Sequence, residues 1–195
     1  MKKGSFSILS AIGICLILIS LIFMVGLRIR AHLGSQNRQR IVTQMAQVLP
    51  ERTPGIPNQT PDSAMPVLEI EGRDYAALLE IPAFGITLPV SDQWEGSKFA
   101  DSPARFSGSV YHDTLIIGGT DDPAQFGFCD EIQHGDLVTV TDMTGARFSF
   151  QVAKIDRANH AEAQWLAEPD YDLTLFCRST YAMEYIAVRC NPAFG

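Results

Sequence analysis

The sequence predicts a mainly β domain, a small closed barrel or a sandwich, that follows one apolar helix and a proline-rich connection. Three observations support this fold class. A run of 24 residues near the amino terminus carries no charge, a stretch with four Pro comes after it, and the last part of the chain holds seven or eight short strand-like runs. The length of 195 residues leaves room for one domain of about 100–150 residues with appendages.

The apolar run extends from Gly4 to Leu27. At about 1.5 Å per helical residue it can span the ~30 Å hydrocarbon core of a bilayer with some tilt. A cleaved signal peptide is the alternative, but its apolar region is usually about 7–15 residues long and ends at small residues. This run is longer and leads into Arg28 and Arg30. We therefore expect residues 1–27 to form a cytoplasmic tip and an uncleaved transmembrane helix.

Residues 28–66 are expected to connect this helix to the folded domain. Ile41 to Leu49 repeats apolar residues at helical spacing, which indicates a short amphipathic helix. The following stretch, ERTPGIPNQTPDSAMP, is rich in Pro and small polar residues and is typical of a linker.

The β domain is expected over residues 67–195, where short apolar or alternating runs are bounded by Gly, Pro and Asp. Helical patterns are sparse there. We expect strands at 77–81, 86–90, 114–117, 137–141, 147–155, 173–176 and 185–188, and short helices at 74–78, 97–100 and 160–166.

The charge of this domain limits its partners. Residues 67–195 carry eight Lys/Arg and twenty Asp/Glu, a net charge of −12. Such an acidic domain repels phosphate backbones, so we expect no nucleic-acid partner.

Five ordered segments resemble the sortase family, in particular class B-like sortases of Gram-positive bacteria. These segments are LLEIPAFGITLPV (78–90), SPARFSGSV (102–110), TLIIGG (114–119), FGFCDEIQHGDLVTVTDMTG (126–145), and the pair DYDLTLFCRS and EYIAVRC near the carboxyl end. The resemblance implies an eight-stranded closed β-barrel with a groove. It also implies a single-pass protein of the cell membrane whose carboxy-terminal domain is extracytoplasmic, with a sorting-signal peptide, a pilin or an active sortase as partner.

Sortases are cysteine transpeptidases, and the resemblance places their three catalytic positions on this sequence. Their chemistry needs a thiolate nucleophile, a His for proton transfer and an Arg that stabilises the oxyanion. The residue at the His position is Gly119, at the Cys position Arg178, and at the Arg position Tyr185. The family's catalytic groups are therefore absent from the matching positions.

A thiol is nevertheless present one residue before the Cys position, at Cys177. Successive strand residues point to opposite faces, so Cys177 faces away from the groove if Arg178 faces it. Cys177 is then an inert buried residue, unless a local bulge turns it into the groove. Arg178 is either a surface charge or an anchor that binds a carboxylate or phosphate. Glu184, beside Tyr185, would oppose a thiolate or an oxyanion.

The remaining candidate residues indicate no metal or cofactor. His112 lies a whole strand away from Gly119, and His32, His134 and His160 stand alone. Asp121 and Asp122 are consistent with a solvated turn or, as an alternative, a calcium site. Besides Cys15 in the apolar run, an odd number of cysteines remains, Cys129, Cys177 and Cys190, so at least one thiol is unpaired within a monomer.

Charge and family give opposite membrane orientations. Lys2 and Lys3 precede the apolar run, whereas Arg28, Arg30, Arg38 and Arg40 follow it. The positive-inside rule alone places the carboxy-terminal side in the cytoplasm. We follow the family resemblance, because long domains translocate largely regardless of charge.

Three functions remain open. The first is a catalytically inactive sortase homologue that binds a peptide or protein in cell-wall or pilus protein attachment. The second is a divergent active cysteine transpeptidase that uses Cys177 to cleave and transfer a sorting-signal peptide. The third is a structural cell-surface domain without a peptide-binding groove.

Overall fold

The computed structural model describes residues 3–50, 53–54, 64–94, 102–111, 114–159, 163–179 and 183–193, without the side chains of 3–11, 25–35 and 163. The chain divides into two compact units, Met1–Asn37 and Arg38–Gly195. The long helix α1, Lys3–Val48, begins in the first unit and ends in the second.

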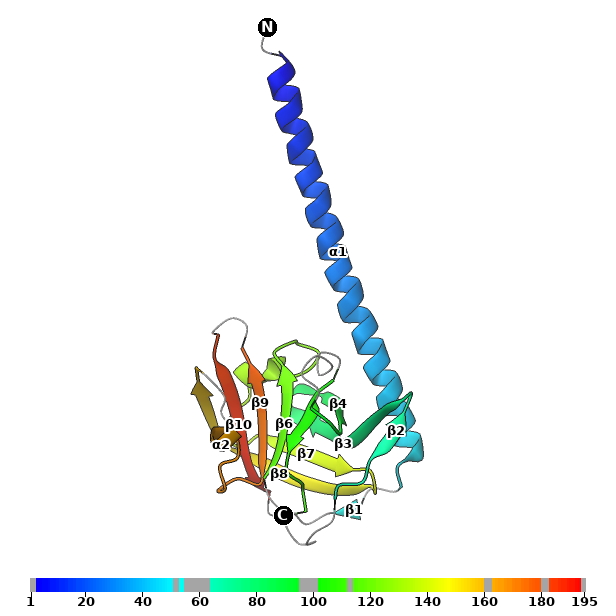
Figure 1. Ribbon diagram of the computed structural model, residues 1–195, viewed down its shortest axis with the longest axis vertical. Helices are drawn as coiled ribbons and strands as arrows, with labels where there is room; N and C mark the ends of the chain where they lie inside the picture. Colours follow the sequence, from blue (N-terminus) through cyan, green and yellow to red (C-terminus); the bar gives the residue numbers. More distant parts are fainter. Residues whose placement is uncertain are drawn as a thin grey trace. The chain divides into compact units, whose positions relative to one another are not determined.

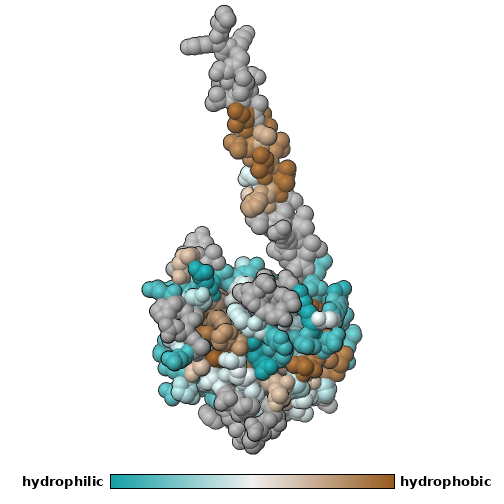
Figure 2. All heavy atoms as spheres, in the orientation of Figure 1, coloured by the Kyte–Doolittle hydropathy of each residue, from teal (hydrophilic) through white to brown (hydrophobic). Residues whose placement is uncertain are grey.

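The first unit consists of the amino-terminal part of α1. Large apolar side chains between Ile12 and Met24 are exposed, and Figure 2 shows hydrophobic residues on the face of the helix in view. Across the described residues, no helix reaches the combined length and apolarity of a membrane span.

The second unit contains a closed β-barrel (Figure 1). Within the described residues, eight strands form a ring in the order β3, β4, β5, β6, β9, β10, β8, β7, and β7 pairs again with β3. The eight-stranded closed barrel expected from the sequence is therefore confirmed. The strands of the ring are β3 (Arg73–Ile81), β4 (Ile86–Ser91), β5 (Ala104–Ser107), β6 (Leu115–Thr120), β7 (Leu137–Asp142), β8 (Ala146–Ala158), β9 (Leu173–Arg178) and β10 (Tyr185–Pro192).

Shorter elements complete this unit. The short strands β1 and β2 extend the sheet from β8 and β3. The bounds of these elements are β1 (Thr53–Pro54), β2 (Leu68–Ile70), η1 (Pro82–Phe84), η2 (Gly127–Asp130) and α2 (Ala163–Leu166).

The barrel forms because its strands alternate apolar and polar residues. In β8, Phe148, Phe150 and Val152 are buried in the main core, whereas Ser149 and Gln151 are exposed. This period of two places every second side chain inside the barrel. The alternation explains why the strand expected at 147–155 is found almost where the sequence predicts it.

The turn between β7 and β8 is held by a buried carboxylate. Asp142 Oδ1 accepts hydrogen bonds from the backbone N–H groups of Thr144 and Ala146, and Tyr111 donates its hydroxyl to Asp142 Oδ2. Burial, together with this hydrogen bond, raises the pKa of Tyr111. Gly145 adopts a φ of 86°, which favours glycine. The carboxylate therefore accepts the hydrogen bonds of backbone N–H groups in and next to the turn that the sequence predicts at 142–145.

The end of α1 belongs to the folded unit. Ile41 and Met45, one helical turn apart, are buried against Tyr75 and Leu78 of β3. The compact unit therefore begins at Arg38, earlier than the domain start expected at Val67.

Part of the expected linker is also ordered against the barrel. The Thr53 N–H donates to the Gly145 carbonyl at 3.0 Å, and Met65 is buried in the main core. The rest of this linker, residues 51–52 and 55–63, lies outside the described residues.

Two short-element predictions need correction. Residues 74–78, expected to be helical, lie within β3, because backbone pairing to β4 and β7 on both sides outweighs local helix propensity. Strand β5 was not predicted, and it forms through long-range pairing of Ala104 with Gly118 of β6. The helix expected at 160–166 is found as α2, and its first three positions, 160–162, lie outside the described residues. The helix expected at 97–100 also lies outside the described residues.

A buried guanidinium joins β10 to the segment that carries α2. Arg189 is fully buried, and its Nε lies 2.6 Å from Asp156 Oδ2 and 3.1 Å from Glu168 Oε2. Its NH1 and NH2 groups donate to the backbone carbonyls of Leu166 and Trp165 at 3.3 and 2.5 Å. A buried charge is stable only when it is paired and hydrogen-bonded, so these contacts fix the α2 segment on the outer face of the barrel.

This arrangement predicts a loss of stability in acid. Burial disfavours the charged form of Asp156, but the hydrogen bonds from Arg189 and Lys154 prevail and lower its pKa. In the unfolded chain this carboxyl titrates near its ordinary value of about 3.9, so on acidification the unfolded state takes up the proton first. The stabilisation that the ionised Asp156 gives to the folded state is therefore present above about pH 4. It is lost as the pH falls through the pKa of Asp156 in the folded state.

We expect Asp156→Asn to lower the urea midpoint of unfolding at pH 6. The gap between the midpoints of the variant and the wild type should narrow towards pH 3. Urea unfolding of the full-length chain across this range measures the effect. Asp74→Asn, the same change at an exposed position of β3, is the control and should leave the midpoint nearly unchanged. A gap for Asp156→Asn that is constant with pH would contradict the role of this ion pair.

Candidate functional site

Three neighbouring strands bring the sequence-predicted positions together. Strand β9 lies between β6, to which it is parallel, and β10, to which it is antiparallel. In this register Gly119 is opposite Cys177, and Arg178 is opposite Tyr185. All three positions matched to the catalytic triad therefore lie at the same end of these strands.

The two faces of β9 have different surroundings. Leu173, Leu175 and Cys177 point into the main core, whereas Phe176 packs in a separate cluster on the outer face. Arg178 follows this alternation and is exposed at the end of the strand. Tyr185, its register partner, is half-buried and belongs to the outer cluster.

The Gly119 position has no room for an inward side chain. A Cβ added there would lie 2.9 Å from the ring of Phe126, which is fully buried. Real Cβ atoms essentially never approach this closely, so a His at this position would require Phe126 to move. Phe126 therefore fills the space that an inward side chain at position 119 would need.

Cys177 is an interior residue. Its exposed fraction is 1%, and the register of β9 runs without a shift against both β6 and β10. The bulge that would turn the thiol outward is therefore absent from this strand.

Two further cysteines belong to this core. Cys129 and Cys190 are buried in the same core as Cys177, and all three are free. Burial raises the pKa of both Cys129 and Cys190, and the neighbouring Cys177 thiol adds to the shift at Cys129. A raised pKa suppresses the thiolate, which is the reactive form of cysteine.

Arg178 contacts an aromatic ring. Its guanidinium carbon lies 6.0 Å from the centroid of the Tyr185 ring, a cation–π contact. Glu184, the acid next to Tyr185, binds Arg157 at 2.7 Å, and Arg157 also contacts Asp130 at 3.1 Å. Arg157 therefore holds two carboxylates that lie near this end of the barrel.

Beside Arg178, an aromatic cluster covers the outer face of β6 and β9. The rings of Trp94, Phe106 and Phe176 contact one another with centroids 5.4–5.7 Å apart. A Cβ added at Gly118 would lie 2.3 Å from Trp94, so this glycine allows the indole to pack directly on the strand. Figure 2 shows apolar side chains at the surface over β9, surrounded by hydrophilic ones.

This aromatic cluster was not predicted from the sequence. Its members come from three separate segments, so no local spacing joins them. A signal was present in the Gly-Gly pair at the end of β6, because adjacent glycines in a strand often mark a close approach by another group.

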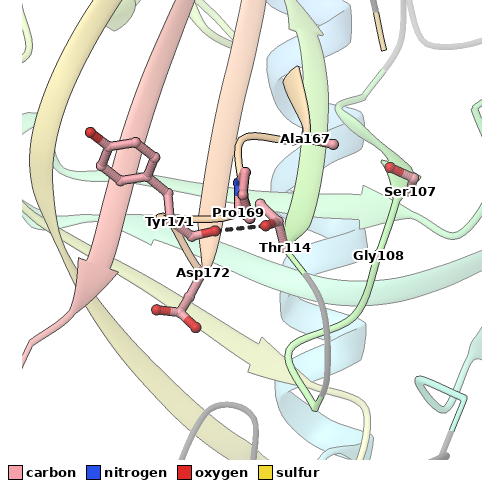
Figure 3. Close-up of a pocket in the computed structure, with 7 residues that line it drawn as sticks. All are labelled: Ser107, Gly108, Thr114, Ala167, Pro169, Tyr171 and Asp172. Carbon is pink, nitrogen blue, oxygen red and sulfur yellow. Dashed lines mark hydrogen bonds between the residues drawn. The ribbon is translucent and has the colours of Figure 1, made fainter. Parts of the chain in front are cut away.

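A cavity of about 490 Å³ lies at the other end of the same strands (Figure 3). It opens beside Thr114, just before β6, and Asp172, just before β9. Thr114 donates its hydroxyl to the Tyr171 carbonyl at 2.7 Å, which ties the two approaching segments together. None of the triad-matched positions lines this cavity, whose remaining walls come from Ser107, Gly108, Ala167 and Pro169.

Other candidate residues are dispersed. His134 is exposed in a turn, the side chain of His32 is not described, and His112 and His160 lie outside the described residues. Asp122 accepts the Ala124 N–H at 2.7 Å, as a turn residue does. Among the residues that the structure describes, no group of three or more His, Cys, Asp or Glu is arranged to hold a metal ion.

Solved structures with the same architecture were found by comparison. Sortase C1 from Streptococcus agalactiae is 21% identical over 65% of this chain and 72% of its own, with a TM-score of 0.55. A lid mutant of sortase A from Corynebacterium diphtheriae is 20% identical over 63% and 72%, with a TM-score of 0.54. A sortase D5 transpeptidase from Clostridium perfringens is 15% identical over 62% and 80%, also with a TM-score of 0.54.

The chain has the sortase fold. The resemblance drawn from the five sequence segments is thereby confirmed at the level of the fold. No protein-family model and no curated protein matches the chain. The low identity to the solved sortases explains this, since the fold persists where sequence similarity has become faint.

Within this sortase fold we expect Cys177 to be unreactive. The thiol should react with iodoacetamide roughly 100-fold or more slowly than an exposed thiol, because it must wait for the barrel to open. Mass spectrometry after labelling of the native full-length chain measures the modification of Cys177. Labelling of the chain unfolded in urea is the positive control, since it shows that the modified peptide containing Cys177 can be detected.

The matched control is Arg178→Cys, which places a thiol one residue further along the same strand on the exposed face. Its added thiol should be labelled within minutes. Equal labelling rates for this thiol and for Cys177 would contradict the buried position of Cys177.

Proposed function

We propose that the chain is a catalytically inactive sortase-fold protein that binds a peptide or protein segment without cleaving it. The observation that carries this proposal is the register of β6, β9 and β10. It brings Gly119, Arg178 and Tyr185 to one end of the barrel, where a sortase requires His, Cys and Arg. None of these three side chains supplies a thiolate or a general base.

The composition of the outer face of β9 supports binding rather than a purely structural role. Strand β9 extends about 20 Å from the cavity beside Asp172 to Arg178, a length that about six extended residues can span. Aromatic rings lie along this face between the two ends. Apolar floors with a few polar groups at their ends are typical of binding sites for extended peptides.

The alternative, a divergent cysteine transpeptidase, depends on Cys177. It requires the thiol to reach the outer face, and this would break the continuous pairing of β9 with two neighbours. The structure offers no specific observation in favour of that function, so we propose the binding function.

Binding without turnover is testable with a fluorescein-labelled sorting-signal peptide and a triglycine amine. We expect saturable binding of the peptide to the full-length chain in mild detergent, measured by fluorescence anisotropy. Mass spectrometry should show neither a thioester nor a transfer product, and Cys177→Ala should change neither result. A product that disappears in Cys177→Ala would establish the transpeptidase, and absence of binding would favour a structural domain.

We also propose that the protein is anchored in the cell membrane by α1, with the barrel on the extracytoplasmic side. The support is the uncharged run from Gly4 to Leu27 and the exposed apolar side chains from Ile12 to Met24. Exposed apolar surface of this extent is unfavourable in water and favourable in a bilayer. Placement of the barrel outside rests on the likeness to sortases.

The anchor can be tested by alkaline carbonate extraction of bacterial membranes that carry the full-length chain. We expect the protein to stay in the membrane pellet, and protease added to intact cells to digest the barrel. Leu16→Arg combined with Ile19→Arg should release it, since each Arg at a helix centre costs about 2.5–3.5 kcal/mol. Gln47→Arg, at the exposed surface beyond the apolar run, is the control. Extraction of the wild type by carbonate, or a barrel protected from protease, would overturn this proposal.

A further inference from the structure

The guanidinium of Arg178 is exposed at the end of β9 and lies over an aromatic ring. Among the described residues, Arg178 contacts the Tyr185 ring, and it forms no ion pair with a described carboxylate. Residues 67–195 have a net charge of −12, so acidic side chains are abundant around it. Ion pairs within the described residues are formed by Arg40, Arg105, Arg147, Lys154, Arg157 and Arg189.

The acid next to Tyr185 is engaged by another cation. Glu184 precedes Tyr185, the register partner of Arg178. Arg157 binds Glu184 Oε1 at 2.7 Å and also contacts Asp130 Oδ1 at 3.1 Å. The hydrogen bond to Glu184 raises the pKa of Arg157, as expected for a cation held by two acids. Among the described residues, the Glu184 carboxylate is therefore paired with Arg157 and not with Arg178.

The Tyr185 ring restricts the guanidinium further. A guanidinium over an aromatic face keeps its edge free, and this edge carries the N–H groups that bind a carboxylate with two parallel hydrogen bonds. The restriction lowers the conformational entropy lost on binding. Phe176, two residues before Arg178 on the same face, is buried and packs against the half-buried rings of Trp94 and Phe106.

We propose that Arg178, positioned by Tyr185, binds a carboxylate of the bound polypeptide. This inference rests on the proposed binding function and names the group that the site recognises. A singly charged carboxylate suits the site better than a phosphate dianion, because the acidic barrel repels the second charge. The carboxylate is either the carboxyl terminus of the polypeptide or the side chain of an Asp or Glu within it.

The test uses three fluorescein-labelled peptides that share a sorting-signal sequence containing one Glu. The first ends in a free carboxylate, the second is its carboxy-terminal amide, and the third is the free acid with Glu replaced by Gln. Anisotropy titrations of the full-length chain in mild detergent give the dissociation constants. Loss of the recognised carboxylate should weaken binding about tenfold, as expected for hydrogen bonds to a charged group. Weaker binding of the amide peptide would identify the terminal carboxylate as the recognised group. Weaker binding of the Gln peptide would identify the Glu side chain.

Variants assign this preference to Arg178. Arg178→Gln should abolish the difference between the acidic and neutral peptides, and Arg178→Lys should keep part of it because the charge remains. Arg147→Gln, the same charge change on a half-buried Arg of β8, should preserve the full difference. Circular dichroism checks that each variant is folded.

Three outcomes would overturn the inference. Equal affinities of the wild type for all three peptides would refute carboxylate recognition while leaving peptide binding intact. A preference that persists in Arg178→Gln would place the carboxylate elsewhere. If no peptide binds to the wild type, both the binding function and the carboxylate site fail.

Discussion

The outer face of this barrel depends on the buried Arg189. Its guanidinium is removed from water by the rings of Trp165 and Tyr171, 5.3 and 5.6 Å away, and is neutralised by Asp156 and Glu168. These partners come from β8 and from the segment between β8 and β9, so one side chain joins regions distant in sequence. Without it, two backbone carbonyls of α2 would lose donors, and two acids would repel each other. The segment so held covers the strands on which the candidate site lies.

The barrel itself could be predicted because its strands obey local rules. Runs such as Arg147 to Ile155 alternate in hydropathy with a period of two, and Gly145 or Asp142 marks their ends. The elements that were missed or misassigned depend on distant partners instead. Strand β5 exists through its pairing with β6, residues 74–78 become a strand between β4 and β7, and the end of α1 folds onto β3. Local patterns cannot contain these contacts.

The candidate site shows the same division. Motif order alone matched the catalytic positions to Gly119, Arg178 and Tyr185, and this match stays a prediction. The strand register places the three residues at one end of the barrel. The surroundings of these positions were beyond the sequence. Three contacts illustrate this: Arg157 binds Glu184, Trp94 packs on Gly118, and Cys177 lies next to Cys129 in the core. In each of them the two side chains come from separate elements.

The packing of Phe126 against Gly119 limits which residues can occupy position 119. Positions 178 and 185 are at or near the surface, so either can change residue with little disturbance to the core. Position 119 differs, because an aromatic ring of the main core occupies the space that a side chain there would need. A histidine at position 119 would require a smaller residue at position 126, and that change by itself would open a cavity and weaken the fold. The two positions are therefore coupled, because the aromatic ring at residue 126 determines which side chains position 119 can accept.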